Sequence, residues 1–162
     1  MGKQIKSVIS ALFGSVAGAA VGAAVAGKKS SKKAQVQRTY AEKHLLIMRM
    51  FNQWMILKQE GKSLEKYFRD NGYQSIAIYG MSYLGERLYD ELKDSGIEVA
   101  YAIDKNADAI YADIDVKKMT DDLTKVDAVI VTAVYYFDEI EEELGELIDY
   151  PIISLEEILY EV

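Results

Sequence analysis

The chain has 162 residues, a length that suits one compact domain with an appendage, and half of the residues are apolar. It contains no cysteine and a single histidine, His44, which excludes disulfides, Cys/His zinc sites and Cys–His nucleophilic chemistry. Residues 1–72 carry 13 basic and 4 acidic side chains, a balance of +9, whereas residues 73–162 carry 6 and 22, a balance of −16. The basic part fits a surface of anionic lipid headgroups, and the acidic part would repel a nucleic-acid backbone.

The first predicted element is the uncharged run VISALFGSVAGAAVGAAVAG over residues 8–27. Its 20 residues match the length of helix that crosses the hydrocarbon core of a bilayer. Gly14, Gly18 and Gly22 recur at intervals of four and form a stripe of small residues that predicts homo-oligomerisation through close helix packing. We therefore expect residues 1–33 to be a single-pass membrane anchor with a glycine zipper and a basic flank.

The charges on either side of this run predict its orientation. Only two lysines precede it, whereas the flank after it holds Lys28, Lys29, Lys32, Lys33 and Arg38. Because the more basic flank stays in the cytoplasm, the globular domain should face the cytoplasm. Two alternatives remain open, a secretory signal peptide cleaved after residues 24–26 and an Ala/Gly-rich flexible tail. The lysine cluster argues against the signal peptide, since positive charge directly after the apolar run resists translocation.

Residues 34–71 are predicted to be a helical connector. A long helix is expected over residues 34–59, which lack Gly and Pro and carry two adjacent apolar stripes. One stripe consists of Tyr40, His44, Ile47, Phe51 and Trp54, and the other of Ala41, Leu45, Met48, Asn52 and Met55. We expect this wide face to pack on the C-terminal domain, with a dimerising helix or one lying on the membrane as alternatives. Gly61 should end the helix, and Ser63 should cap a short helix that stops at residues 71–72.

Residues 72–162 alternate between strand and helix patterns. Such alternation predicts an α/β fold, here a small Rossmann-like parallel sheet of about five strands. The expected strands cover residues 75–79, 99–104, 114–116, 126–133 and 151–153. Helices are expected after the first strand, with Leu84, Leu88 and Leu92 on one face, over residues 137–148, and from residue 155 to the end, capped by Ser154.

The first strand, a glycine-rich turn, a helix and a second strand ending in an acid together match the dinucleotide-binding fingerprint. Gly80 would permit the tight turn, and Gly85 would let the helix pack against the strand. Free N–H groups at the start of the helix would face a phosphate or pyrophosphate. Asp104, 24 residues after Gly80, is placed to bind ribose hydroxyls, and its charge would favour NAD over NADP. The pattern departs from G-x-G-x-x-G at Ser82, whose Cβ would crowd the pyrophosphate although its hydroxyl can bond a phosphate.

Three further residues complete the predicted cofactor-binding set. Tyr83 lies in the glycine-rich turn, and Thr132 and Tyr135 follow the fourth strand, where the carboxyl edge of a parallel sheet opens onto ligands. Tyr135 or its neighbour Tyr136 is suited to stacking on a base or a sugar, and ordinary packing of these rings is the alternative.

No convincing catalytic or metal-binding set is found. Two Tyr-x-x-x-Lys pairs, Tyr89/Lys93 and Tyr101/Lys105, match the motif of short-chain epimerases. The first lies on the wrong helix for that role, and the second begins on a strand, where residues four apart are about 13 Å from each other. The acidic side chains between residues 138 and 146 are interpreted as a solvated helix face and not as a metal site.

The segment from Trp54 to Val162 resembles a family of short bacterial Rossmann-like domains associated with surface-polysaccharide biosynthesis. The resemblance rests on the stretches IAIYGMSYLGERLYDELK, VAYAIDKN, VDAVIVTAVYYFDEIEEEL and PIISLEEIL. These domains are similar to the nucleotide-binding parts of nucleotide-sugar epimerases. The resemblance implies binding of NAD or a nucleotide-sugar at Gly80, Ser82, Gly85 and Asp104.

The combined prediction is a membrane-tethered nucleotide-binding module that is non-catalytic alone and serves bacterial surface-polysaccharide biosynthesis. Its expected partners are a small-molecule nucleotide and the cell membrane, with no nucleic acid. One alternative is an interaction scaffold whose Rossmann-like domain holds no ligand. Another is a subunit of an oxidoreductase or epimerase that a second chain completes.

Overall fold

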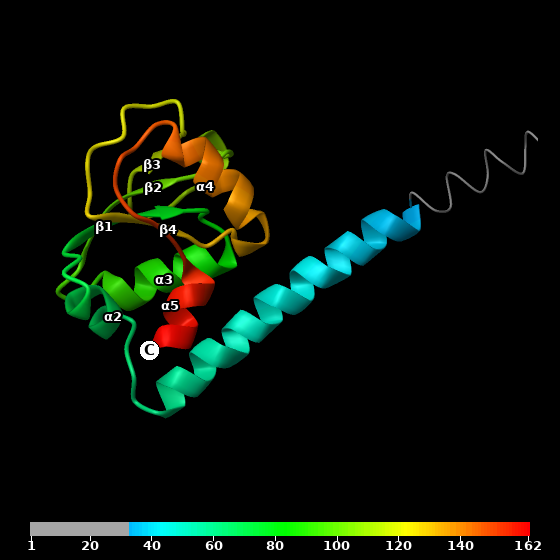
Figure 1. Cartoon of the computed structure of the whole chain (residues 1–162), viewed down its shortest axis with the longest axis horizontal. Coiled ribbons are helices and arrows are strands. Elements are labelled where there is room, and N and C mark those ends of the chain that lie inside the picture. Colours follow the sequence, from blue (N-terminus) through cyan, green and yellow to red (C-terminus); the bar gives the residue numbers. More distant parts are fainter. Residues whose placement is uncertain (1–32) are drawn as a thin grey trace, which may run out of the picture. The chain divides into compact units, whose positions relative to one another are not determined.

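The computed structural model describes residues 33–162 (Figure 1). The predicted membrane anchor, its glycine stripe at Gly14, Gly18 and Gly22, and its orientation fall on residues 1–32 and lie outside this range. Residue contacts divide the chain into two units, Met1–His44 and Leu45–Val162, and the second contains the α/β domain. Among the helices of the described range, none combines the length and the apolar character needed to cross a bilayer.

The first helix covers residues 33–59 in its described part, as the sequence predicted. Within the second unit it packs through the buried side chains of Met50, Trp54 and Leu57, with Ile47 and Phe51 half-buried beside them. The expected packing on the domain is therefore confirmed for this part of the helix, where Ile47, Phe51 and Trp54 of one predicted stripe take part together with Met50 and Leu57, which belong to neither stripe. The stripe of Leu45, Met48 and Met55 is exposed. Gly61, with a φ of +71°, follows the helix end.

A short helix, α2 (Glu65–Asp70), connects the first helix to the sheet. The N-cap position of α2 is Leu64 and not Ser63 as predicted, but the Ser63 hydroxyl, one residue earlier, accepts a hydrogen bond from the Glu65 N–H at 3.2 Å. The helix stops before Gly72, whose φ of +77° is the left-handed conformation expected there.

The sheet has five parallel strands in the order β3-β2-β1-β4-β5, which confirms the predicted Rossmann-like architecture. The strands are β1 (Ser75–Tyr79), β2 (Glu98–Ile103), β3 (Val116–Lys117), β4 (Ala128–Val131) and β5 (Ile152–Ser154). Between the strands lie the α-helices α3 (Tyr83–Leu92) and α4 (Phe137–Gly145) and the short 3-10 helices η1 (Ala107–Ala109) and η2 (Val134–Tyr136), and α5 (Leu155–Glu161) follows the last strand.

Several predicted boundaries were wrong by a few residues. The third strand was expected over residues 114–116, but β3 pairs with β2 only through Val116 and Lys117. The fourth strand is shorter than residues 126–133, because its ladder to β1 begins at Ala128 and ends at Val131. Apolar character therefore extends past the paired segment: Val126 is buried without belonging to the strand.

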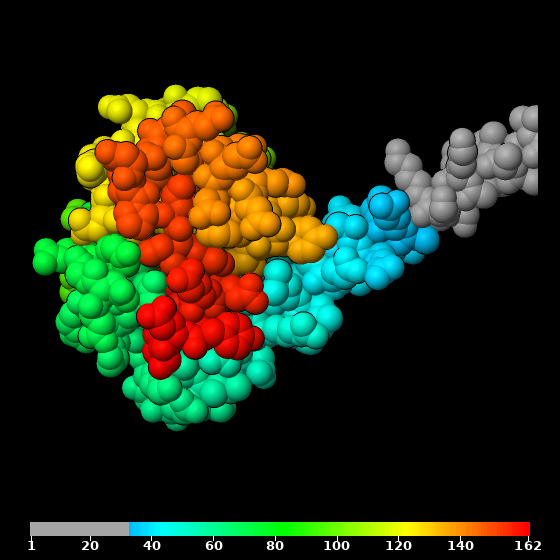
Figure 2. All heavy atoms as spheres, viewed as in Figure 1, coloured from blue at the N-terminus to red at the C-terminus, as the bar shows by residue number. Residues whose placement is uncertain are grey.

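Two hydrophobic cores cover the two faces of the sheet. Alternate side chains of β1 point to opposite faces, with Ile76 and Ile78 in one core and Ala77 and Tyr79 in the other. The first core joins the sheet to the first helix, α2, α3 and α5, and the second joins it to α4 and the chain between β3 and β4. Figure 1 shows α3 and α5 on one side of the strands and α4 on the other. In the space-filling view, α4 and α5, in orange and red, lie on the side of the domain that faces the viewer (Figure 2).

Candidate functional site

Gly80 forms the tight turn directly after β1. Its N–H donates to the Ile103 carbonyl of β2 at 2.8 Å, and its φ is +96°. A Cβ at this position would lie 2.9 Å from the Thr132 Oγ1 atom, so space and backbone conformation both require glycine. The turn thus lies between the ends of β2 and β4, at the switch point of the sheet.

Gly85 lets α3 approach the same turn. A Cβ on Gly85 would lie 2.0 Å from the Gly80 carbonyl oxygen, a distance that would force the backbone to move. The close packing of helix against turn, predicted from the glycine spacing, is present in the structure. It fixes the first turn of α3 directly beside the end of β1.

Asp104 follows β2 and reaches across to the glycine-rich turn. Its Oδ2 accepts the Met81 N–H at 2.9 Å, and its Oδ1 accepts the Asn106 N–H at 2.8 Å. The side chain is half-buried. A carboxylate has about four acceptor positions, so roughly two remain for an external donor. The sequence predicted that Asp104 lies near the turn, but it did not predict the hydrogen bond from the Met81 N–H.

The first N–H groups of α3 are not used by the helix itself. The Glu86 N–H bonds to the Ser82 carbonyl at 2.9 Å and is the first intrahelical bond, so the N–H groups of Tyr83, Leu84 and Gly85 precede the ladder. Ser82 has an extended backbone, and its exposed side chain makes no capping bond. Tyr83 is largely exposed beside it. This is the local geometry that suits a phosphate at a helix N-terminus.

Thr132 and Tyr135 behave differently from each other. Thr132 is buried, and its Oγ1 lies 2.6 Å from the Gly80 carbonyl oxygen and 3.1 Å from that of Tyr79, so its single O–H links β4 to the end of β1. Its hydroxyl is therefore engaged within the protein. Tyr135 in η2 is 37% exposed and packs edge-on against Tyr136, with 5.2 Å between ring centroids. Of these two predicted residues, only Tyr135 offers a surface to a ligand.

Tyr79, the last residue of β1, was missed by the sequence analysis. Its hydroxyl is buried and has no hydrogen-bond partner among residues 33–162. Burial, followed by the charges of Glu143 and Asp104, raises the pKa of Tyr79 to about 12. Nearby, Lys105 and Glu143 form an exposed ion pair at 3.5 Å. The alternation of β1, which puts residues 77 and 79 on the face of α4, was the available signal.

Glu91 on α3 forms a second polar cluster that the sequence did not reveal. One oxygen accepts the Trp54 Nε1–H at 2.6 Å, and the other accepts the Leu64 N–H at 2.8 Å and pairs with Lys58. The cluster borders an apolar groove of about 550 Å³. The groove is lined by Phe51, Trp54, Met55, Lys58, Ser63, Arg87 and Glu91.

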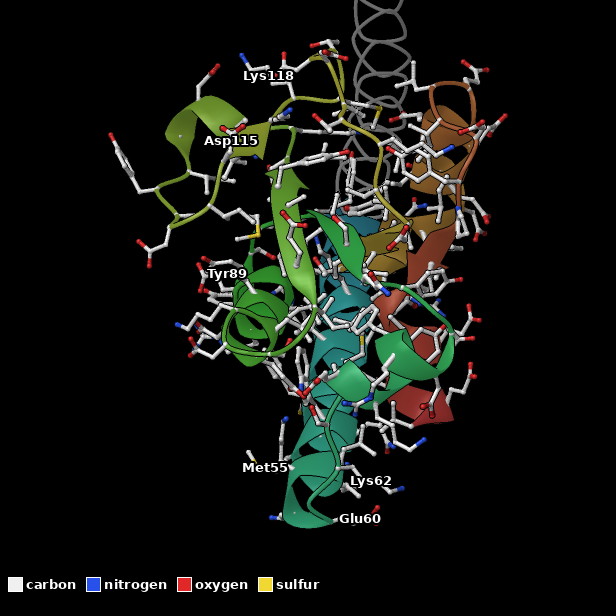
Figure 3. All side chains as sticks on the ribbon, turned by 90° about the vertical axis from the view of Figure 1, so that its left-hand side faces the viewer. Met55, Glu60, Lys62, Tyr89, Asp115 and Lys118 are labelled. Carbon is white, nitrogen blue, oxygen red and sulfur yellow. The ribbon has the colours of Figure 1, made fainter. Side chains whose placement is uncertain are left out.

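The Tyr-x-x-x-Lys pairs are not arranged for proton transfer. Tyr89, labelled in Figure 3, donates to the Asp113 carbonyl, and Lys93 pairs with Asp90 at 2.8 Å. The Tyr101 hydroxyl is turned into the protein, where it donates to the Thr124 carbonyl at 2.7 Å.

The acids of α4 lie largely on its exposed side. Over residues 33–162, no three His, Cys, Asp or Glu side chains are grouped so as to hold a metal ion.

Comparisons with protein-family models, with curated proteins and with solved structures gave no match. The fold and the arrangement of the residues at the carboxyl edge of the sheet therefore carry the functional argument.

Proposed function

We propose that residues 72–162 bind a nucleotide, either NAD or a nucleotide-sugar, at the carboxyl edge of β1 and β2. The module is non-catalytic on its own and serves the assembly of bacterial surface polysaccharide. The observation that carries the proposal is the contact between Asp104 and the glycine-rich turn, since the Asp104 carboxylate accepts the Met81 N–H at 2.9 Å. This contact supports the proposal because it holds Asp104, the acid that would bind the ribose, near the N–H groups at the start of α3 that precede the helix ladder.

The ligand would lie across the turn in the manner of other doubly wound sheets. Its phosphates would accept from the N–H groups of Tyr83, Leu84 and Gly85 at the start of α3. Its ribose hydroxyls would donate to the acceptor positions that Asp104 keeps after its two backbone bonds. Tyr135 would supply a ring for the base or the sugar.

Asp104 also defines the selectivity of the proposed site. A 2′-phosphate would bring two negative charges against this carboxylate, so NADP should bind more weakly than NAD. A ligand with a single pyrophosphate is therefore favoured over more highly charged nucleotides.

We further propose that residues 1–33 tether this module to the cell membrane, and the support for this part of the proposal comes from the sequence alone. The uncharged run of residues 8–27 and the lysines that follow it are the features expected of an anchor with the domain on its cytoplasmic side. Nucleotides are abundant on that side, so the two parts of the proposal agree.

The test is thermal unfolding of the full chain in neutral detergent, with and without NAD, NADP, UDP-glucose and UDP. Trp54 is the single tryptophan, is buried and is bonded to Glu91, so its fluorescence reports unfolding of the domain. A ligand at 100 times its Kd should add about 2.7 kcal/mol, a shift of several degrees.

The pattern of shifts identifies the ligand class. Stabilisation by NAD and not by NADP supports a dinucleotide site at Gly80 and Asp104. Stabilisation by the uridine compounds alone assigns the site to a nucleotide-sugar. No shift with any of the four compounds rules out these ligands and leaves the scaffold as the better account.

A further inference from the structure

Two buried tyrosines of the second core differ in the partners of their hydroxyl groups. Tyr101 on β2 donates to the Thr124 carbonyl at 2.7 Å, and its oxygen lies 3.4 Å from the Tyr150 hydroxyl. Tyr79 on β1 is 3% exposed, and its hydroxyl has no partner among residues 33–162. A buried hydroxyl without a partner destabilises a fold, and a phenylalanine would fill nearly the same space without that cost. Packing of the core therefore does not account for the Tyr79 hydroxyl.

Tyr79 lies at the edge of the sheet where the proposed nucleotide site is found. It is the last residue of β1, directly before Gly80. In the sheet it pairs with Ile103, the last residue of β2, which directly precedes Asp104. Tyr101 lies two residues earlier in β2 and is thus further from this edge. Of the two tyrosines, Tyr79 is the one beside the residues that would hold the ligand.

The charges that act on the Tyr79 hydroxyl indicate which kind of ligand group suits it. Burial, followed by the charges of Glu143 and Asp104, raises the pKa of Tyr79 to about 12, so the hydroxyl stays protonated at neutral pH. It can donate one hydrogen bond and accept others, but it is not suited to take a proton from a ligand. A phosphate would bring further negative charge towards two carboxylates, whereas an uncharged polar group would not.

The ion pair between Lys105 and Glu143 connects the end of β2 to α4 in the same region. The two charged atoms lie 3.5 Å apart, and the side chains are 66% and 50% exposed. An exposed pair of this kind contributes little to stability, so both side chains can turn away from each other at small cost. The pair is therefore a part of the site that a ligand can displace.

We propose that Tyr79 is a specificity-determining residue of the nucleotide site and that its hydroxyl bonds to the base of the nucleotide. The Asp104 carboxylate would take the ribose hydroxyls, and the base attached to that ribose is the uncharged polar group next to Tyr79. When the ligand binds, the pair of Lys105 and Glu143 opens and the polar edge of the base reaches the hydroxyl. The inference rests on the proposed function and deepens it, because it adds recognition of the base.

The test compares Tyr79→Phe with Tyr101→Phe in the full chain in neutral detergent. Each substitution removes one buried hydroxyl from the same core. Tyr79→Phe should weaken binding of the nucleotide about five- to tenfold, the effect of one lost hydrogen bond, and should leave the melting temperature of the free protein unchanged or raised. Tyr101→Phe should keep the wild-type affinity and melt several degrees lower, since the Thr124 carbonyl loses its donor. Isothermal titration calorimetry and thermal unfolding measure the two effects.

Pairs of ligands that differ only in the base test which group the hydroxyl contacts. NAD is compared with nicotinamide hypoxanthine dinucleotide, and UDP-glucose with ADP-glucose. In the pair that the wild-type chain binds, Tyr79→Phe should bring the two affinities closer by about fivefold, and Tyr101→Phe should leave their ratio unchanged. Weaker binding by Tyr79→Phe with an unchanged ratio would show that the hydroxyl contacts another part of the ligand and would overturn the assignment to the base.

The remaining outcomes separate failure of this inference from failure of the proposed function. Equal affinities of the wild-type chain and Tyr79→Phe would remove the hydroxyl from the site and leave the nucleotide site in place. A lower melting temperature of the free Tyr79→Phe protein would show that the hydroxyl has a structural bond and is not reserved for a ligand. If the wild-type chain binds none of the four compounds, the proposed function fails and this inference fails with it.

Discussion

Glu91 and Asp104 are two carboxylates of the same domain with different surroundings. The Glu91 side chain is 8% exposed, and its partners are the side chains of Trp54, Lys58 and Ser63 and the backbone of Leu64. Asp104 is half-buried at the edge of the sheet and accepts two backbone N–H groups. Glu91 therefore has little acceptor capacity left, while Asp104 keeps about half of its own.

The difference separates a structural acid from a candidate binding acid. Glu91 joins the first helix, the connecting loop and α3 through its contacts with Trp54, Lys58 and Leu64. Asp104 stabilises the turn that contains Gly80, and part of its carboxylate stays accessible to a ligand. Substitution of the first should mainly change the free energy of unfolding, and substitution of the second should mainly change ligand affinity.

The largest effect is expected for Glu91→Ala. The variant leaves the Trp54 Nε1–H and the Leu64 N–H without their acceptor and removes the partner of Lys58, so the free energy of unfolding should fall by about 4 kcal/mol. Urea unfolding followed by Trp54 fluorescence measures this loss. Glu86→Ala, an exposed acid on the same helix, is the control and should change stability by less than about 0.5 kcal/mol. Equal losses in the two variants would contradict the structural role of Glu91.

Gly85→Ala should have the next largest effect. The new Cβ would lie 2.0 Å from the Gly80 carbonyl oxygen, and moving the backbone apart should cost about 3 kcal/mol, near the upper end for overpacking. Gly145→Ala on α4 is the matched control, because nothing lies within 4 Å of its Cβ position, and it should gain about 0.5 to 1 kcal/mol. Thermal unfolding compares the two. A gain at both positions would show that α3 and the turn are not in close contact.

Features that depend on residues close together in the sequence were predicted, and features that depend on residues far apart in the sequence were not. Local signals predicted the five strands, the positive φ of Gly72 and the cap at Ser154, where the hydroxyl accepts the Glu156 N–H at 3.2 Å. A turn residue, a cap and an alternating strand each depend on a few neighbours in the chain, and a short window of sequence is enough to recognise them.

Contacts between distant residues were not predicted. The Trp54–Glu91 bond spans 37 residues and the bond of Thr132 to Tyr79 at the end of β1 spans 53, and no local pattern distinguishes these side chains from ordinary surface and strand residues. The first helix shows the same limit. Its two apolar stripes were recognised, but the buried face also contains Met50 and Leu57, which belong to neither stripe and were missed because their burial depends on where α3 and α5 lie.

Asp104→Asn gives a smaller effect on stability and a specific effect on binding. The amide keeps one oxygen as an acceptor, so one of the two backbone N–H groups loses its partner, and the free energy of unfolding should fall by about 1 kcal/mol. Loss of the charge should weaken NAD about tenfold and narrow the preference for NAD over NADP. Isothermal titration calorimetry with both nucleotides measures this. Unchanged affinities for both would remove Asp104 from the proposed site.

The smallest effect is expected for Asp127→Asn, which tests whether two backbone bonds alone define a binding acid. Asp127 accepts the N–H groups of Ser75 at 2.9 Å and Gln74 at 2.8 Å, the same kind of contact that Asp104 makes, but beside the amino end of β1 and β4. These bonds, of which the one from Ser75 has the larger effect, hold the pKa of Asp127 below its ordinary value.

The lowered pKa predicts how stability depends on pH. A carboxyl whose pKa is lower in the folded than in the unfolded chain stabilises the fold above the unfolded pKa of about 4, and this contribution is lost as the pH falls through the folded value. Asp127→Asn should therefore flatten the loss of stability below about pH 4 and leave NAD affinity unchanged, as measured by urea unfolding across pH and by calorimetry. Weaker NAD binding in this variant would mean that the effect of Asp104→Asn is transmitted through the sheet and does not arise at a ligand contact.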